Sequence, residues 1–155
     1  MDFKKLANQY KDELLDNVLP FWLKNSQDHE YGGYFTCLDR EGKVFDTDKF
    51  VWLQGREVWM FSILYNKIEK RQEWLECAIQ GGEFLKKYGH DGNYNWYFSL
   101  DRSGRPLVEP YNIFSYTFAA MAFGQLSLVT GNQEYADIAR KTFDIILSKV
   151  DNPKG

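Results

Sequence analysis

The strongest constraint on the fold is an alternation between two kinds of helical segment. Residues 51–65 and 113–123 are apolar nearly all round, which is typical of helices that are buried on every side. The segment after each of them, residues 70–88 and 133–150, is apolar on one face and charged on the other. This alternation predicts a two-layer array of helical hairpins with the buried helices inside. If the array curves on itself, it becomes an (α/α) toroid.

Three shorter segments complete the predicted order of elements. Apolar residues at three- to four-residue spacing predict a helix over residues 2–18, ended by Pro20. Residues 31–43 and 92–107 each combine an aromatic run with a Gly-containing turn, which predicts a β-hairpin. We therefore expect a short hairpin before each pair of helices.

An internal repeat supports this arrangement. The pattern Leu-Asp-Arg-x-Gly-Lys/Arg occurs at residues 38–43 and again at residues 100–105. The offset of about 60 residues suits a unit of two helices and a hairpin, and six such pairs would need about 350–400 residues. The 155 residues hold five predicted helices. We therefore expect an all-α (α/α)6 barrel of which residues 1–155 form the first part, as one domain. The alternative is a short, self-sufficient helical domain.

Composition and charge exclude several classes of function. Lys and Arg total 19 against 22 for Asp and Glu, so no basic excess exists to neutralise a nucleic-acid backbone. No apolar run approaches the length of about 18 residues that a membrane span needs. The charged N-terminus lacks the apolar stretch of a signal peptide. Cys37 and Cys77 have the spacing of neither a zinc site nor a disulfide framework, which favours a reduced, cytoplasmic location.

Arg56 is the best candidate for chemistry. It lies on a helix that is apolar all round, where an unpaired charge costs several kcal/mol. Either a carboxylate such as Glu57 or Asp46 pairs with it, or it faces a polar cavity where a ligand supplies acceptors. Trp52, four residues earlier, shares its helix face. An aromatic plane beside a guanidinium group suits a sugar, and the residues alone leave both alternatives open.

Three motifs together carry a family resemblance. They are Gly32-Gly33-Tyr34, Leu38-Asp39-Arg40-x-Gly42 and, most specific of all, Trp52-x-Gln54-x-Arg56-x-x-Trp59. With the later stretches 96–106 and 118–125, they resemble the N-terminal part of the N-acylglucosamine 2-epimerase family. That family includes mannose and cellobiose epimerases and related isomerases. The resemblance covers essentially the whole chain.

The resemblance implies an (α/α)6 barrel with a sugar pocket at one mouth and no metal or cofactor. It also implies that the C2 proton of an open-chain sugar is removed, and that the resulting enediolate is reprotonated on its other face. Arg56 would stabilise the developing oxyanion. Trp52, Gln54, Tyr111 and Tyr116 would bind the sugar.

The sequence departs from the family at the acid/base groups. The family uses two histidines in later helices, which this chain lacks. His29 and His90 lie in predicted loops beside acidic residues, so we interpret both as surface residues. We therefore expect that this chain alone does not epimerise. An incomplete barrel would expose apolar inner helices, so we also expect it to associate, with a homodimer as one form.

Two other functions remain open at this stage. A glycoside hydrolase on the same barrel would need a carboxylate pair, with Asp28, Asp101 or Glu109 as candidates. A non-catalytic carbohydrate-binding or protein-interaction module would keep the aromatic inner face without acid/base groups. Of the remaining polar residues, Cys77 is expected in the core, while Asp39 and Asp101 should accept hydrogen bonds from turn amides.

Overall fold

The computed structural model describes residues 2–110 and 112–151. The helices are α1 (Phe3–Glu13), the π-helical segment η1 (Leu14–Val18), α2 (Leu19–Asn25), α3 (Val51–Lys67), α4 (Gln72–Tyr88), α5 (Phe114–Thr130) and α6 (Gln133–Ser148). The strands are β1 (Cys37–Leu38), β2 (Val44–Asp46), β3 (Lys49–Phe50), β4 (Ser99–Leu100) and β5 (Pro106–Val108).

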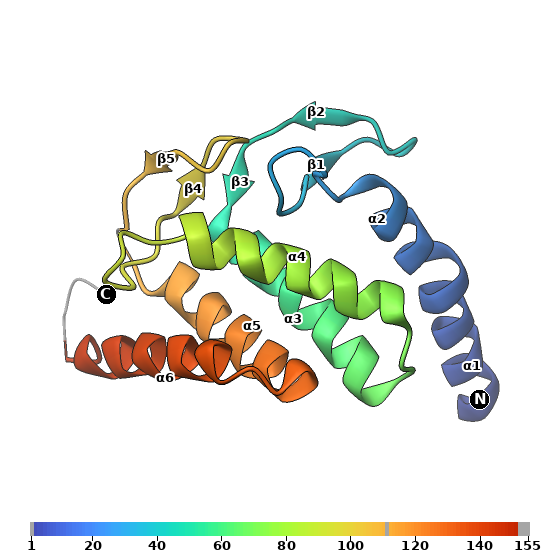
Figure 1. The fold of residues 1–155 in the computed structure, drawn as a ribbon. Coiled ribbons are helices and arrows are strands. Elements are labelled where there is room, and N and C mark those ends of the chain that lie inside the picture. Colours follow the sequence, from blue (N-terminus) through green and yellow to red (C-terminus); the bar gives the residue numbers. More distant parts are fainter. Residues whose placement is uncertain (1, 111, 152–155) are drawn as a thin grey trace.

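Two helical hairpins, α3–α4 and α5–α6, form the body of the molecule (Figure 1). Helix α3 packs against both α4 and α5, and α5 packs in turn against α6. The two hairpins therefore meet through α3 and α5, the helices whose sequences are apolar nearly all round. This confirms the predicted pairing of inner and outer helices.

Short antiparallel strands precede each helical hairpin and lie on the same side of the helices (Figure 1). Strand β3 extends the second hairpin into a three-stranded sheet, in which Lys49 lies opposite Leu100. The strands are shorter than predicted, since residues 92–98 form a loop before β4. Both turns are closed as predicted: Asp39 accepts hydrogen bonds from the amides of Glu41 and Lys43, and Asp101 accepts one from the amide of Arg105.

The prediction that Pro20 ends the first helix is wrong. Helical backbone continues from α1 through η1 and α2 to Asn25. Pro20 lies inside this continuous helical stretch, where its missing N–H removes one hydrogen bond of the ladder. Just before it, the wide π-turn of η1 lets the N–H of Leu19 reach the carbonyl of Leu14.

Aromatic side chains fill the core between the helices. Trp74, Trp96 and Tyr34 are all fully buried, and the indole N–H of Trp96 donates to Thr142 Oγ1 over 3.1 Å. Cys77 is buried at 1% exposure and carries a free thiol, as expected for a small core residue.

The inner helix α5 is not buried on every side, contrary to the prediction. One face carries Phe114, Met121 and Leu128, which are 46%, 42% and 71% exposed. The reason is that α5 packs mainly against α3 and α6, which leave these side chains partly in contact with solvent. The apolar pattern of α5 thus indicates more contacts than the described residues make.

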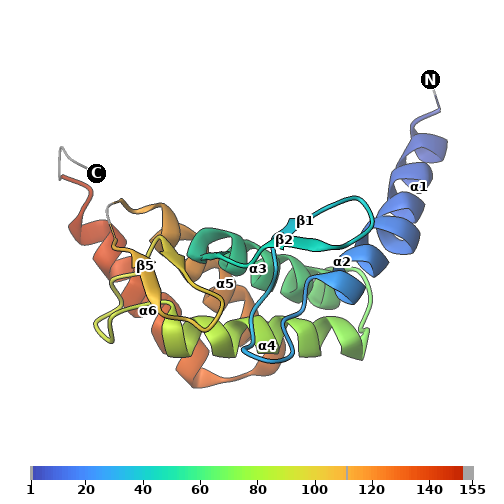
Figure 2. The same ribbon diagram turned by 90° about the horizontal axis from the view of Figure 1, so that it is seen from above.

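Helix α1 projects away from the helical hairpins (Figures 1 and 2). None of its residues is buried, and Phe3 and Tyr10 are at least 70% exposed. The apolar residues whose spacing predicted this helix therefore form an exposed stripe along it. No helix in the described part of the chain is long and apolar enough to cross a membrane.

Candidate functional site

A cavity of about 230 Å³ lies between the α1–α2 helical stretch and α3. Its lining is mostly apolar but includes the polar side chains of Thr36, Arg56 and Glu57. The other lining residues are Val18, Trp22, Leu53 and Met60. The hydroxyl of Thr36 is shielded from solvent and has no hydrogen-bond partner among the described residues. An apolar cavity with a few unused polar groups is the usual form of a small-molecule site. We call it the Arg56 cavity.

Arg56 lies at the exposed edge of this cavity. No carboxylate in the described part of the chain forms an ion pair with its guanidinium group, so the predicted alternative of pairing with Glu57 or Asp46 is not realised. The guanidinium group therefore keeps its donors available for a ligand.

Glu57 is the functional group that the sequence analysis missed. It is 8% exposed, and its Oε1 accepts a hydrogen bond of 2.6 Å from Ser26 Oγ. Burial raises the pKa of Glu57 to about 8, so the carboxyl is neutral at pH 7. The signal in the sequence is an acidic residue at a core position of an apolar helix. A neutral Glu57 leaves the positive charge of Arg56 uncompensated.

Trp52 lies one helical turn from Arg56 but not in the Arg56 cavity. Its half-buried indole packs against the rings of Phe114 and Phe118, with centroids 5.3 and 5.7 Å away. Trp52 therefore faces α5, whereas Arg56 faces α2. The aromatic wall beside Arg56 is Trp22 of α2, to which sequence analysis gave no role.

Gln54 and Tyr116 are buried away from the Arg56 cavity. The side-chain amide of Gln54 is fully used, since Oε1 accepts from the Tyr34 amide over 2.8 Å and Nε2 donates to the Tyr34 carbonyl over 2.9 Å. Tyr116 is 1% exposed, and its hydroxyl donates to Asn95 Oδ1 over 3.3 Å. Tyr111, the fourth predicted sugar contact, lies outside the described residues.

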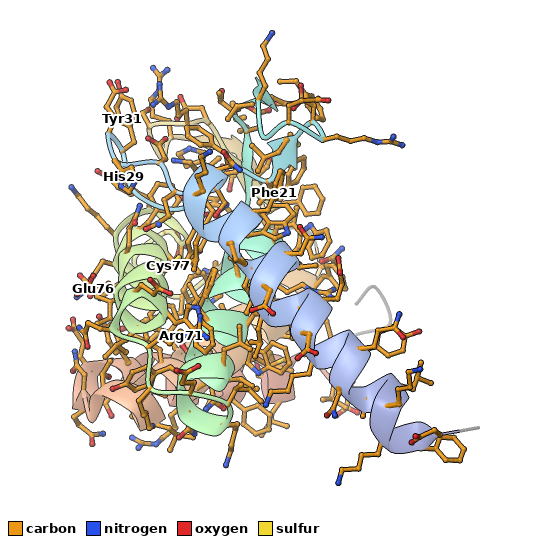
Figure 3. The ribbon with its side chains drawn as sticks, turned by 90° about the vertical axis from the view of Figure 1, so that its right-hand side faces the viewer. Phe21, His29, Tyr31, Arg71, Glu76 and Cys77 are labelled. Carbon is orange, nitrogen blue, oxygen red and sulfur yellow. The ribbon has the colours of Figure 1, made fainter. Side chains whose placement is uncertain are left out.

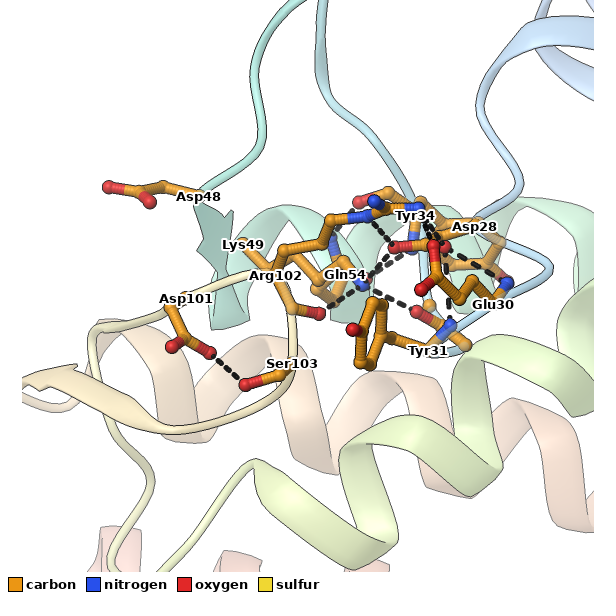
Figure 4. A network of polar contacts seen from close by, with 12 residues as sticks. Asp28, Glu30, Tyr31, Tyr34, Asp48, Lys49, Gln54, Asp101, Arg102 and Ser103 are labelled. Carbon is orange, nitrogen blue, oxygen red and sulfur yellow. Dashed lines mark hydrogen bonds and ion pairs between the residues drawn. The ribbon is translucent and has the colours of Figure 1, made fainter.

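A buried ion cluster lies beside the start of α3 (Figure 4). Asp28 pairs with Lys49 over 2.9 Å and accepts two hydrogen bonds from the guanidinium group of Arg102. Burial would raise the pKa of Asp28, but the hydrogen bonds from Arg102 and Lys49 outweigh it and lower the pKa to about 2. Asp28 is therefore ionised at neutral pH and does not act as a general acid.

The carboxylates considered for a glycoside hydrolase do not meet at the cavity. Neither Asp28 nor Asp101 lines it, and the side chain of Asp101 is held by the turn of the second β-hairpin. Glu109 is exposed at the surface. Among the described residues, these three carboxylates therefore do not form the flanking pair that this reaction needs.

The two histidines are placed differently from each other. His29 lies exposed in the loop after α2 (Figure 3), as predicted. His90 is half-buried, which corrects the prediction of a surface residue: its ring stacks on Tyr94 with centroids 4.7 Å apart and meets the edge of Trp96. Burial lowers the pKa of His90. Neither histidine lines the Arg56 cavity.

Comparisons with known proteins agree with these observations. The sequence model of the N-acylglucosamine 2-epimerase (GlcNAc 2-epimerase) family matches residues 33–155. The N-acylglucosamine 2-epimerase of Mus musculus is 44% identical over 149 residues, which are 93% of this chain and 36% of that protein. The cellobiose 2-epimerase of Dictyoglomus turgidum is 27% identical, over 100% of this chain and 40% of that protein.

A solved structure shows the same arrangement of helices. The cellobiose 2-epimerase of Bacillus thermoamylovorans B4167 superposes with a TM-score of 0.86 at 29% identity, covering 97% of this chain and 39% of that chain. The described fold is thus part of an (α/α)6 barrel, as predicted. The chain spans 36% to 40% of the length of these relatives. By its sequence and its fold, it belongs to the N-acylglucosamine 2-epimerase family.

Proposed function

We propose that this chain forms the N-terminal part of a sugar 2-epimerase site, in which Arg56 stabilises an enediolate. The observation that carries the proposal is the guanidinium group of Arg56, which lies at the edge of a mostly apolar cavity and forms no ion pair with a carboxylate of residues 2–110 or 112–151. The relatives named above are epimerases of N-acylglucosamine and of cellobiose, which supports a sugar as the substrate class.

The chemistry requires a fixed positive charge. Removal of the C2 proton from an open-chain aldose moves negative charge onto the carbonyl oxygen at C1. A cation already in place stabilises that oxygen without reorganising, and it does so more strongly in a cavity poor in water. Glu57 supports this role, because its neutral carboxyl does not cancel the charge of Arg56 at pH 7.

Trp52, Gln54 and Tyr116 serve the sugar site in different ways. Trp52 offers its half-buried indole as a surface for the sugar ring, on the α5 side of Arg56. Gln54 acts indirectly, by holding the backbone at Tyr34 two residues before Thr36. The burial of Tyr116 favours an indirect role for that residue as well. Tyr111 stays a prediction as a sugar contact.

The acid/base groups come from other segments. The chain has two histidines, and both lie outside the Arg56 cavity. We therefore expect that the chain alone exchanges no hydrogen at C2. C2 exchange by the isolated chain in D₂O, followed by proton NMR of N-acetylglucosamine, would contradict this assignment.

A chimera tests the function itself. In it, this chain replaces the matched 149 residues of the Mus musculus relative. We expect C2 exchange by the chimera, lowered about 100-fold or more by Arg56→Met because an oxyanion-stabilising group is lost. The matched control Arg140→Met removes an exposed arginine paired with Asp137 and should leave exchange unchanged. A chimera that binds sugar without exchange, while the mouse parent exchanges, would favour the carbohydrate-binding module.

Association and location complete the proposal. The exposed apolar residues of α1 and α5 support a homodimer, which light scattering on the purified chain would detect as twice the mass of 18.3 kDa. The thiols of Cys37 and Cys77 are both free, which supports a reducing, cytoplasmic location.

A further inference from the structure

Lys49 is a fully buried cation with all its donors in use. Its side chain is 0% exposed, and Nζ donates to Asp28 Oδ2 over 2.9 Å, to the Gly32 carbonyl over 2.6 Å and to the Arg102 carbonyl over 2.8 Å. The ring of Phe84 lies 4.5 Å from Nζ. An ammonium group has three N–H donors, so this set of partners defines one position for it.

The partners of Lys49 come from separate segments of the chain (Figure 4). Asp28 and Gly32 belong to the loop after α2, and Arg102 belongs to the turn between β4 and β5. Lys49 itself lies in β3, directly before α3. One ammonium group therefore ties the start of α3 to the loop that leads into the first β-hairpin and to the turn of the second.

The positive and negative charges around Lys49 balance one another. Arg102 donates to Asp28 over 3.0 and 3.1 Å and pairs with Glu30 over 2.9 Å. Two cations thus face two carboxylates, and we call Asp28, Glu30, Lys49 and Arg102 the Lys49 cluster. The Arg102 guanidinium also lies 5.2 Å from the ring of Phe35, so the cluster holds the residue just before Thr36.

The Lys49 cluster is coupled to both walls of the Arg56 cavity. Through Phe35 it holds the segment that places Thr36 on one side. Through β3 it holds the first turn of α3, with Trp52 three residues and Arg56 seven residues beyond Lys49. A shift of Lys49 would therefore move Thr36 relative to Arg56.

A buried ion pair such as Asp28–Lys49 contributes little to stability by itself, because well-packed apolar side chains of the same size often stabilise a protein as much or more. Its hydrogen bonds instead fix direction and distance, which apolar packing does less strictly. We propose that Lys49 is a positioning residue of the sugar site, which sets the place of Trp52 and Arg56 relative to Thr36. The part that concerns sugar rests on the proposed function above.

The test removes the buried charges as a pair. The double variant Asp28→Asn/Lys49→Met keeps both side-chain shapes and leaves Arg102 its partner Glu30. Lys86→Met is the matched control, since Lys86 pairs with Glu83 and Glu134 at the outer surface. Three quantities are compared with the wild type: the melting temperature, the NMR signals of Arg56 Nε–H and the Trp52 indole N–H, and the affinity for N-acetylglucosamine.

A positioning role predicts a folded double variant in which both NMR signals shift and the affinity falls about tenfold or more. The control should change neither the signals nor the affinity. A folded double variant with unchanged signals and wild-type affinity would overturn the proposal. A wild-type chain that binds no sugar would overturn the proposed function instead, and the two NMR signals would then decide the positioning role.

A second variant covers the case in which the double variant does not fold. Arg102→Gln changes only the part-exposed edge of the Lys49 cluster, where the side chain is 38% exposed. It removes the two hydrogen bonds to Asp28 but leaves the ammonium of Lys49 its three acceptors. We expect the same two signals to shift by a smaller amount. Unchanged signals in this folded variant would overturn the proposal.

Discussion

Glu57 gives the sharpest quantitative prediction, because its environment reverses the usual pH dependence of an acidic residue. Burial raises its pKa from 4.5 to about 8 in the folded protein. Between these two values the unfolded chain has lost the proton while the folded protein keeps it. The folded state binds more protons there, so the free energy of unfolding falls as the pH rises from about 4.5 to 8.

The size of the effect follows from the shift. Each pKa unit corresponds to about 1.4 kcal/mol, so Glu57 lowers stability by about 1.4 kcal/mol per pH unit in the middle of the window. The total over the whole window is about 5 kcal/mol. Above pH 8 the carboxyl ionises in both states, and its contribution stops changing.

Glu57→Gln removes the titration and keeps the size of the side chain. The amide can still accept the hydrogen bond from Ser26 Oγ. We expect the stability of the variant minus that of the wild type to increase by about 3–4 kcal/mol between pH 5 and pH 8. Urea unfolding followed by circular dichroism at each pH unit measures this difference.

The control is Glu41→Gln, which removes one carboxyl group at the exposed turn of the first β-hairpin. A pH-independent difference between Glu57→Gln and the wild type would show that folding does not raise the pKa of Glu57. That result would mean that Glu57 is ionised in the folded protein, and the claim that it leaves Arg56 uncompensated would fail with it.

Two further predictions concern the loop after α2. The lowered pKa of Asp28 stabilises the wild type by about 2 kcal/mol above the ordinary pKa of an aspartate, and this contribution is lost as the pH falls toward 2. Asp28→Asn should therefore lose less stability than the wild type between pH 4 and pH 2. An equal loss of the free energy of unfolding in both proteins, measured by urea unfolding, would contradict this. Gly33→Ala should cost about 1–3 kcal/mol, since φ is +69° and an added Cβ would meet Gln54 Oε1 at 2.7 Å and the Phe84 ring at 2.8 Å. Gly92→Ala, with φ +89° and open space around it, should cost less in the same thermal melts, and equal losses would show that the contacts at Gly33 do not matter.

The arrangement of the helices could be predicted because it repeats a local pattern. The periodicity of apolar residues distinguished α3 and α5, which are apolar nearly all round, from the amphipathic α4 and α6. The two Leu-Asp-Arg motifs marked the turns of the β-hairpins. Pro20 shows the limit of such rules. Its helix-breaking effect depends on its place in a turn, and the π-helical segment before it has no sequence pattern that we recognised.

The chemistry of the site was less predictable, because it depends on contacts between distant residues. Arg56 could be singled out as a charge on an apolar helix. The partner of Gln54 is the backbone of Tyr34, 20 residues away, and no periodicity indicates such a bond. In the sequence, Glu57 stands out only as an acidic residue at a core position of an apolar helix, and nothing in the local pattern indicates that Lys49 is buried. Their roles follow from burial and from the partners that burial brings together.

An NMR titration of the chain with N-acetylglucosamine shows whether the Arg56 cavity holds sugar. We expect a saturable shift of the Arg56 Nε–H signal together with the methyl signals of Thr36 and Met60, which line the same cavity. The Nε–H signal of Arg140, on the exposed side of α6, should stay in place. Arg56, Thr36 and Met60 signals that remain unchanged at saturating sugar would mean that the Arg56 cavity does not bind it.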